Sequence, residues 1–113
     1  MATQIPSNMF PLGWIQPVPG TPMDLFENYP ALRDEQFYVN LIMIQAGPNN
    51  VGSIWIGNQT LVRATNTGVI YVLTTAGDSF ILGNYAVNIL EAMKFRIDSE
   101  LAGDGVYVSV YVR

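Results

Sequence analysis

The sequence has 113 residues, the length of one small domain; half of them are hydrophobic, 12% are charged, and none is histidine or cysteine. This composition excludes zinc sites built on Cys or His, disulfides, Cys nucleophiles and Ser-His-Asp triads, so we expect no cofactor. Nine acidic against five basic residues give a net charge of −4, which argues against a nucleic-acid partner. No apolar run approaches the roughly 20 residues of a membrane span, so no membrane partner is expected.

Residues 1–36 are expected to form an extended, proline-rich N-terminal arm. Six of the seven prolines lie in the first 30 residues, and each fixes its own φ and disfavours helix at the preceding residue. The segment also carries Phe10, Trp14 and Phe26, and soluble monomers avoid exposing large apolar side chains. We therefore expect the arm to fold back over its own domain or to lie across another chain. Deleting residues 2–30 is then expected to leave the domain folded and to abolish its attachment to a partner.

Residues 37–113 are predicted to fold as a β domain. Runs rich in β-branched and aromatic residues alternate with turns of Gly, Asn, Asp and Pro, except in residues 84–93, which are compatible with a helical turn. The predicted strands are 37–44, 52–56, 59–63, 69–75, 79–82, 94–98 and 106–113. Six or seven short strands of this kind predict an all-β, compact antiparallel β-sandwich, jelly-roll-like, or a small barrel.

Alternation within the strands predicts which aromatic side chains lie outside the core. In the last strand, the valines at alternate positions point inward, so Tyr107 and Tyr111 point outward. If Ile54 and Ile56 fill the core, Trp55 also lies outside. Such aromatics are typical of protein interfaces, although scattered surface residues, cover by the arm, or a sugar-stacking platform are alternatives. The candidate interface residues are Phe10, Trp14, Phe26, Trp55, Tyr107 and Tyr111. The predicted domain of residues 37–113 is small, rich in hydrophobic residues and nearly neutral. Such a composition favours association, so we expect a homo-oligomer.

Asp98, Glu100 and Asp104 form a local cluster of carboxylates, with Asp98 on the outer side of its strand. Their spacing matches no EF-hand loop, and acidic residues beside glycine are common in hairpin turns. Glycoside hydrolysis needs two carboxylates in a cleft, which nothing in the sequence predicts. We therefore expect no catalytic residue and no enzyme. A small metal-dependent hydrolase that uses all three carboxylates is the alternative, and their joint replacement by alanine would test it.

Several motifs in the second half of the chain resemble small structural proteins of tailed bacteriophages. Residues 51–58 read V-G-S-I-W-I-G-N, similar to the V-x-I-x-I-G-N opening common in those proteins. Residues 77–82 and 97–108 then resemble their G-x-S-x-x-L and I-D-x-x-x-A-G-D-G-V-x-V runs. The resemblance covers residues 51–113 and leaves residues 1–36 outside.

The resemblance implies a virion β-sandwich protein, most like the capsid decoration (cement) proteins. Such a protein binds the major capsid protein across capsomer junctions on the outer surface of the phage head and stabilises the shell. Sites of local three-fold symmetry would suit a homotrimer. A head-fibre, tail or receptor/carbohydrate-binding module of a phage is the alternative that the same resemblance leaves open.

Overall fold

The structure, a computed structural model, describes residues 8–26, 39–83 and 94–112 of the chain. The expected helical turn in residues 84–93 and the start of the expected strand 37–44 lie outside the described residues. The strands are β1 (Asn8–Ile15), β2 (Met23–Asp24), β3 (Val39–Ala46), β4 (Ile54–Val62), β5 (Thr67–Leu73), β6 (Ser79–Gly83), β7 (Arg96–Ser99) and β8 (Val106–Val112). A short 3₁₀ turn, η1 (Arg63–Thr65), connects β4 to β5.

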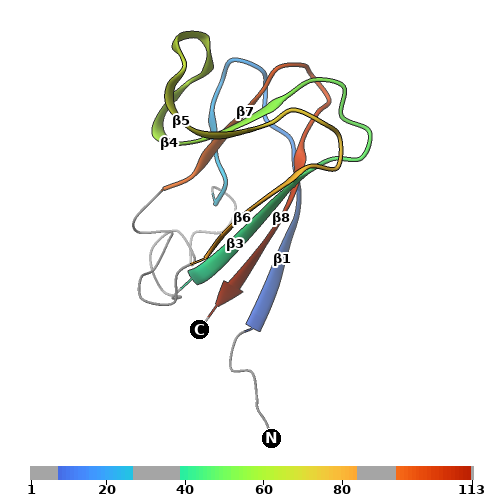
Figure 1. Cartoon of the computed structure of the whole chain (residues 1–113), viewed down its shortest axis with the longest axis vertical. Coiled ribbons are helices and arrows are strands. Elements are labelled where there is room, and N and C mark those ends of the chain that lie inside the picture. Colours follow the sequence, from blue (N-terminus) through green and yellow to red (C-terminus); the bar gives the residue numbers. More distant parts are fainter. Residues whose placement is uncertain (1–7, 27–38, 84–93, 113) are drawn as a thin grey trace, which may run out of the picture.

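The strands form two antiparallel four-stranded sheets that pack against each other (Figure 1). One sheet has the order β1-β8-β3-β6 and the other has the order β2-β7-β4-β5. The first strand pairs with the last, the second with the seventh, the third with the sixth, and the fourth with the fifth. The chain is thus one long antiparallel ribbon rolled into a sandwich, which is a jelly roll. The predicted all-β antiparallel sandwich is confirmed. The N-terminal segment supplies two strands that the sequence did not predict, β1 and β2.

The N-terminal segment belongs to the sandwich. β1 pairs along its length with β8, and β2 pairs with β7. Four apolar side chains of the segment are buried in the core: Leu12, Ile15, Leu25 and Phe26. The expected division into an arm of residues 1–36 and a sandwich of residues 37–113 is therefore wrong for residues 8–26. The segment is extended, as its prolines predicted, but it pairs with strands of its own chain.

Proline suits this segment because β1 lies at the edge of its sheet. Pro11 lies opposite Ser109 of β8, and within the described part of the chain no strand pairs with the other side of β1. A residue without an N–H is accommodated at an edge strand or a bulge, where a ladder hydrogen bond is not required. The pairing also shifts between Pro11 and Gly13, and Gly13 adopts a φ of 81°. The prolines thus shape an edge strand and do not prevent one.

The core between the sheets follows the predicted alternation. Val106, Val108 and Val110 of β8 are at most 1% exposed, and Ile54 and Ile56 of β4 are fully buried. Burial of each such side chain stabilises the folded state by about 1.5–3 kcal/mol. The alternation in these two strands therefore accounts for a large part of the stability of the core. The predicted inward position of the three valines is confirmed, and the condition on which the position of Trp55 depended, burial of Ile54 and Ile56, is met.

β4 is continuous where the sequence predicted two strands separated by a turn at residues 57–58. The pairing of β4 with β5 shifts register on both sides of Gly57. A Cβ at this position would overlap the carbonyl oxygen of Gly68 on β5. The glycine therefore permits a bulge and a close approach of two strands, which its local sequence does not distinguish from a turn.

Candidate functional site

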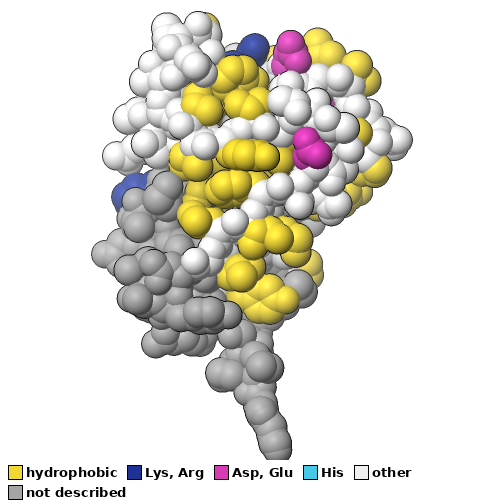
Figure 2. Space-filling view, in the orientation of Figure 1, with side chains coloured by type: hydrophobic (Ala, Val, Ile, Leu, Met, Phe, Trp, Pro, Cys, Tyr) yellow, Lys and Arg dark blue, Asp and Glu magenta, His cyan; other side chains and the backbone are white. Residues whose placement is uncertain are grey.

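The outward side of the sheet β1-β8-β3-β6 carries uncharged side chains arranged in three rows by the strand register. The first row is Trp14, Tyr107, Gln45 and Ser79, the second is Pro11, Ser109, Met43 and Ile81, and the third contains Tyr111 and Leu41. We call these ten side chains the outer face. Ile81 is 58% exposed. Figure 2 shows hydrophobic side chains over the region of β6 that continue towards β5 of the other sheet, with few charged side chains beside them.

Trp14 and Tyr107 form an aromatic pair at one end of the outer face. Their ring centroids are 5.0 Å apart and their planes are tilted by 59°. The side chains are 43% and 48% exposed. The indole lies directly against the backbone of two glycines, since a Cβ at Gly47 or at Gly105 would come within 2.7 Å of its ring carbons. The indole Nε1 donates a hydrogen bond of 3.2 Å to Gln16 Oε1. The ring is therefore held by its contact with the two glycine backbones and by this hydrogen bond.

A pocket of about 350 Å³ opens beside this pair. It is lined by Trp14, Pro48, Asn49, Asn50, Gly103 and Tyr107. Two turns form the walls of the pocket, one that contains Asn50 and one that contains Gly103. Side-chain hydrogen bonds join these two turns. The Asn50 carboxamide donates to the carbonyl of Gly105 (2.8 Å) and accepts from its N–H (3.1 Å). The buried Asp104 carboxylate accepts from the N–H groups of Val51 (3.0 Å) and Gly52 (2.6 Å). The pocket is therefore built from turns that are fixed relative to each other.

The six residues predicted as interface contacts do not all share one surface. Three lie on the outer face: Trp14, Tyr107 and Tyr111. Trp55 is half-buried on β4, in the other sheet. Phe26 is 2% exposed in the chain's own core, which corrects its assignment as an anchor on another chain. Phe10 lies opposite Val110 in the register of β1 and β8, and its side chain is outside the described part of the structure.

Sequence reasoning missed the apolar residues that β3 and β6 add to the outer face, namely Leu41, Met43 and Ile81. A signal was present, because residues 41–44 and 80–82 are apolar without interruption. Such runs are typical of strands with two apolar faces. The run does not tell which of its faces remains open, since that depends on the place of the strand in the sandwich.

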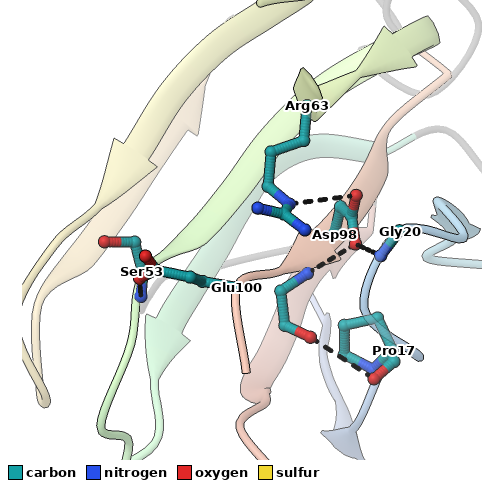
Figure 3. A network of polar contacts seen from close by, with 7 residues as sticks. Pro17, Gly20, Ser53, Arg63, Asp98 and Glu100 are labelled. Carbon is teal, nitrogen blue, oxygen red and sulfur yellow. Dashed lines mark hydrogen bonds and ion pairs between the residues drawn. The ribbon is translucent and has the colours of Figure 1, made fainter. Parts of the chain in front are cut away.

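Asp98 of β7 lies on the side of its strand opposite Ile97, as the alternation predicted, and pairs with Trp55 of β4. It is nevertheless buried, because the turn at Gly20 covers it. Its side chain is 1% exposed, and its Oδ1 accepts hydrogen bonds from the N–H groups of Gly20 (2.9 Å) and Ser99 (2.8 Å) (Figure 3). Its Oδ2 lies 3.4 Å from Nε of Arg63, and neither atom has a hydrogen-bond partner within the described residues. The Ser99 hydroxyl donates to the carbonyl of Pro17 at 3.5 Å. Asp98 thus joins the N-terminal segment and η1 to β7.

The other two carboxylates of the predicted cluster also bind backbone amides. Glu100 Oε1 accepts from the N–H of Ser53 at 3.1 Å, and Asp104 is 4% exposed between its two amide donors. Across residues 8–26, 39–83 and 94–112, no group of three or more acidic side chains is placed to hold a metal ion. The structure therefore does not bring Asp98, Glu100 and Asp104 together as the hydrolase alternative requires.

Replacing Asp104 with alanine is expected to lower the free energy of unfolding by about 2 kcal/mol, because two backbone N–H groups lose a charged acceptor. Glu100→Ala is the matched control, since within the described part of the chain this exposed carboxylate accepts from one backbone amide only. This variant should lower the free energy of unfolding by no more than about 1 kcal/mol. Urea unfolding followed by tryptophan fluorescence measures both changes. Equal losses for the two variants would contradict the special role of Asp104.

Among the described residues, no helix is long and apolar enough to cross a membrane. No protein-family model matches the sequence, and no curated protein matches it. The outer face and the adjoining pocket are two candidate functional surfaces of the described part of the chain.

Proposed function

We propose that this chain is a non-enzymatic virion structural protein, a capsid decoration (cement) protein that binds across capsomer junctions on the outer surface of a phage head. The observation that carries the proposal is the uncharged, largely apolar outer face of the sheet β1-β8-β3-β6. Jelly rolls occur in viral capsid proteins, and the motifs in residues 51–113 resemble phage structural proteins. Both features support the proposal independently of the outer face.

The second and third rows of the outer face supply the proposed contact with the major capsid protein. Met43, Ile81, Leu41 and Tyr111 present apolar side chains from adjacent strands. Surfaces of this kind mark interaction sites, and aromatic residues and methionine are enriched in protein interfaces. No charge has to be desolvated there, and the sheet orders these side chains before binding, which lowers the entropic cost of association.

A protein that binds only the assembled lattice stabilises it by mass action. At a free concentration of 100 times Kd, the stabilisation is about 2.7 kcal/mol per site. Contacts across junctions between capsomers have this property, since the junction exists only in the shell. A homotrimer with closed cyclic symmetry would match sites of local three-fold symmetry and engage three junctions at once.

The second candidate is a head-fibre, tail or receptor/carbohydrate-binding module. The exposed pair of Trp14 and Tyr107 beside a pocket favours it. The two candidates differ in copy number, because a shell protein follows the lattice and a fibre or tail protein does not. Quantitative mass spectrometry of purified particles against the major capsid protein separates them. A ratio near one to one supports decoration, a handful of copies supports the second candidate, and absence from particles contradicts both.

Ile81→Lys is expected to reduce binding to capsids that lack the protein at least about tenfold, because a charge would be buried in the apolar contact. Val62→Lys is the matched control: it also replaces a β-branched apolar side chain by lysine, at a 46% exposed position on the other sheet. Both residues are exposed, so both variants should remain folded. Co-sedimentation with capsids measures the loss, and equal binding of the two variants would contradict the proposed contact.

A further inference from the structure

We infer that the pocket beside Trp14 and Tyr107 binds a neutral saccharide of one or two sugar rings. This inference goes beyond the capsid contact and does not depend on it. It assigns Trp14 and Tyr107, in the first row of the outer face, a ligand of their own. The volume of about 350 Å³ lies at the small end of the range of about 300–1,000 Å³ for small-molecule sites.

The indole of Trp14 is mounted as a platform. One side of the ring rests on the backbone of Gly47 and Gly105, where any Cβ would collide with it, while 43% of the side chain remains exposed. A pyranose ring has an apolar face of C–H groups and polar hydroxyls at its edge. An exposed aromatic ring covers such an apolar face, and a tilted neighbour, here Tyr107 at 59°, forms a second wall.

The hydrogen bond already made by the indole N–H favours a sugar over a proline-rich peptide as the ligand. Aromatic grooves that bind proline-rich segments dock an extended chain with a polar backbone. Here the indole N–H is already bonded to Gln16 Oε1, so Trp14 offers a ring face and no free donor for a peptide carbonyl. The lining contains no charged residue, which favours a neutral ligand.

Two polar groups at the rim are available to sugar hydroxyls. Asn49 is exposed and lines the pocket, and its carboxamide has no hydrogen-bond partner within the described part of the chain. The same holds for the hydroxyl of Tyr107 among the described residues. A few polar groups beside an apolar wall are the usual composition of a small-molecule site. Because Asn50 and Asp104 fix the two turns, the backbone that carries Asn49 is in place before the ligand arrives, and Tyr107 is held on strand β8.

Tryptophan fluorescence provides a direct test, since the sequence contains two tryptophans, Trp14 and Trp55. In a Trp55→Phe background, Trp14 is the sole reporter. We expect titration with maltose, cellobiose, chitobiose or N-acetyllactosamine to change its emission with a Kd of about 0.1–10 mM for at least one of them. A sulfated heparin disaccharide should bind no better than the neutral sugars.

Four variants locate the site by calorimetry or ligand-observed NMR on the full chain. Trp14→Ala should weaken binding at least about tenfold, and the exposed Asn49→Ala should weaken it several-fold without affecting folding. Trp55→Phe, on the other sheet, should bind like the parent protein. Ile81→Lys should also keep saccharide binding while losing the capsid contact, so failure of one proposal is distinguishable from failure of the other.

Absence of binding by every neutral sugar at about 50 mM would overturn the inference. Undiminished binding in folded Asn49→Ala and Trp14→Ala proteins would overturn it as well, since the sugar would then occupy another place. Tighter binding of a polyproline peptide at Trp14 would replace the saccharide by a peptide ligand and equally refute it.

Discussion

Replacing Asp98 with alanine is expected to lower the free energy of unfolding by about 3 kcal/mol. The side chain is 1% exposed, and its Oδ1 accepts hydrogen bonds from the N–H groups of Gly20 and Ser99. Its removal also leaves Nε of Arg63 buried without a counter-charge. The Arg63 side chain is 29% exposed, so water compensates part of the loss. The effect therefore falls at the lower end of the roughly 3–5 kcal/mol typical of broken buried pairs. Urea unfolding monitored by circular dichroism measures it.

Two further variants separate the parts of this network. Asp98→Asn keeps an acceptor oxygen for the two amides and loses the charge opposite Arg63. It should therefore lower the free energy of unfolding by less than Asp98→Ala does. Asp78→Ala is the matched control, because among the described residues this carboxylate accepts a hydrogen bond only from the N–H of Thr75 in its own turn. Its effect should stay within about 1 kcal/mol. If Asp98→Ala is no more destabilising than Asp78→Ala, the buried network does not hold the N-terminal segment to β7.

A chain that lacks residues 2–26 is expected to be unfolded. The deletion removes four described side chains of the hydrophobic core, Leu12, Ile15, Leu25 and Phe26. At about 1.5–3 kcal/mol each, they contribute about 6–12 kcal/mol, which is comparable with the whole stability of a small domain, about 5–15 kcal/mol. It also strips β8 and β7 of their edge partners. This reverses the expectation from the sequence that a deletion of residues 2–30 leaves a folded domain.

Circular dichroism and the dispersion of amide NMR signals measure the effect of the deletion. A chain that lacks residues 2–7 is the control, because it retains every described residue of β1 and β2. Native dispersion in the chain that lacks residues 2–26 would contradict the assignment of β1 and β2 to the sandwich. It would restore the interpretation of this segment as a separate arm.

Local sequence features were sufficient to predict most of the strands and several turns. Period-two alternation is a property of a few neighbouring residues, so the inward side of β8 and the orientation of Ile54 and Ile56 followed from it. Positive φ at Asn66 (59°) and Gly77 (84°) agrees with the turns predicted there, because these residue types tolerate that conformation. The fold class and the outward position of Tyr107 were thus available without a structure.

The role of the N-terminal segment and the composition of the two surfaces depended on contacts between distant parts of the chain. β1 pairs with β8, at the opposite end of the sequence, and no local pattern specifies such a partner. Asp98 alternates like an outward residue, yet the turn at Gly20 covers it. Likewise, the indole of Trp14 packs on the backbone of Gly47 and Gly105, and this contact exists only because the fold brings their two turns together. Local propensities determine the backbone conformation of each residue and the side of the strand on which its side chain lies. Which side chains are buried, and which residues they contact, depends on how the strands pair and how the two sheets stack.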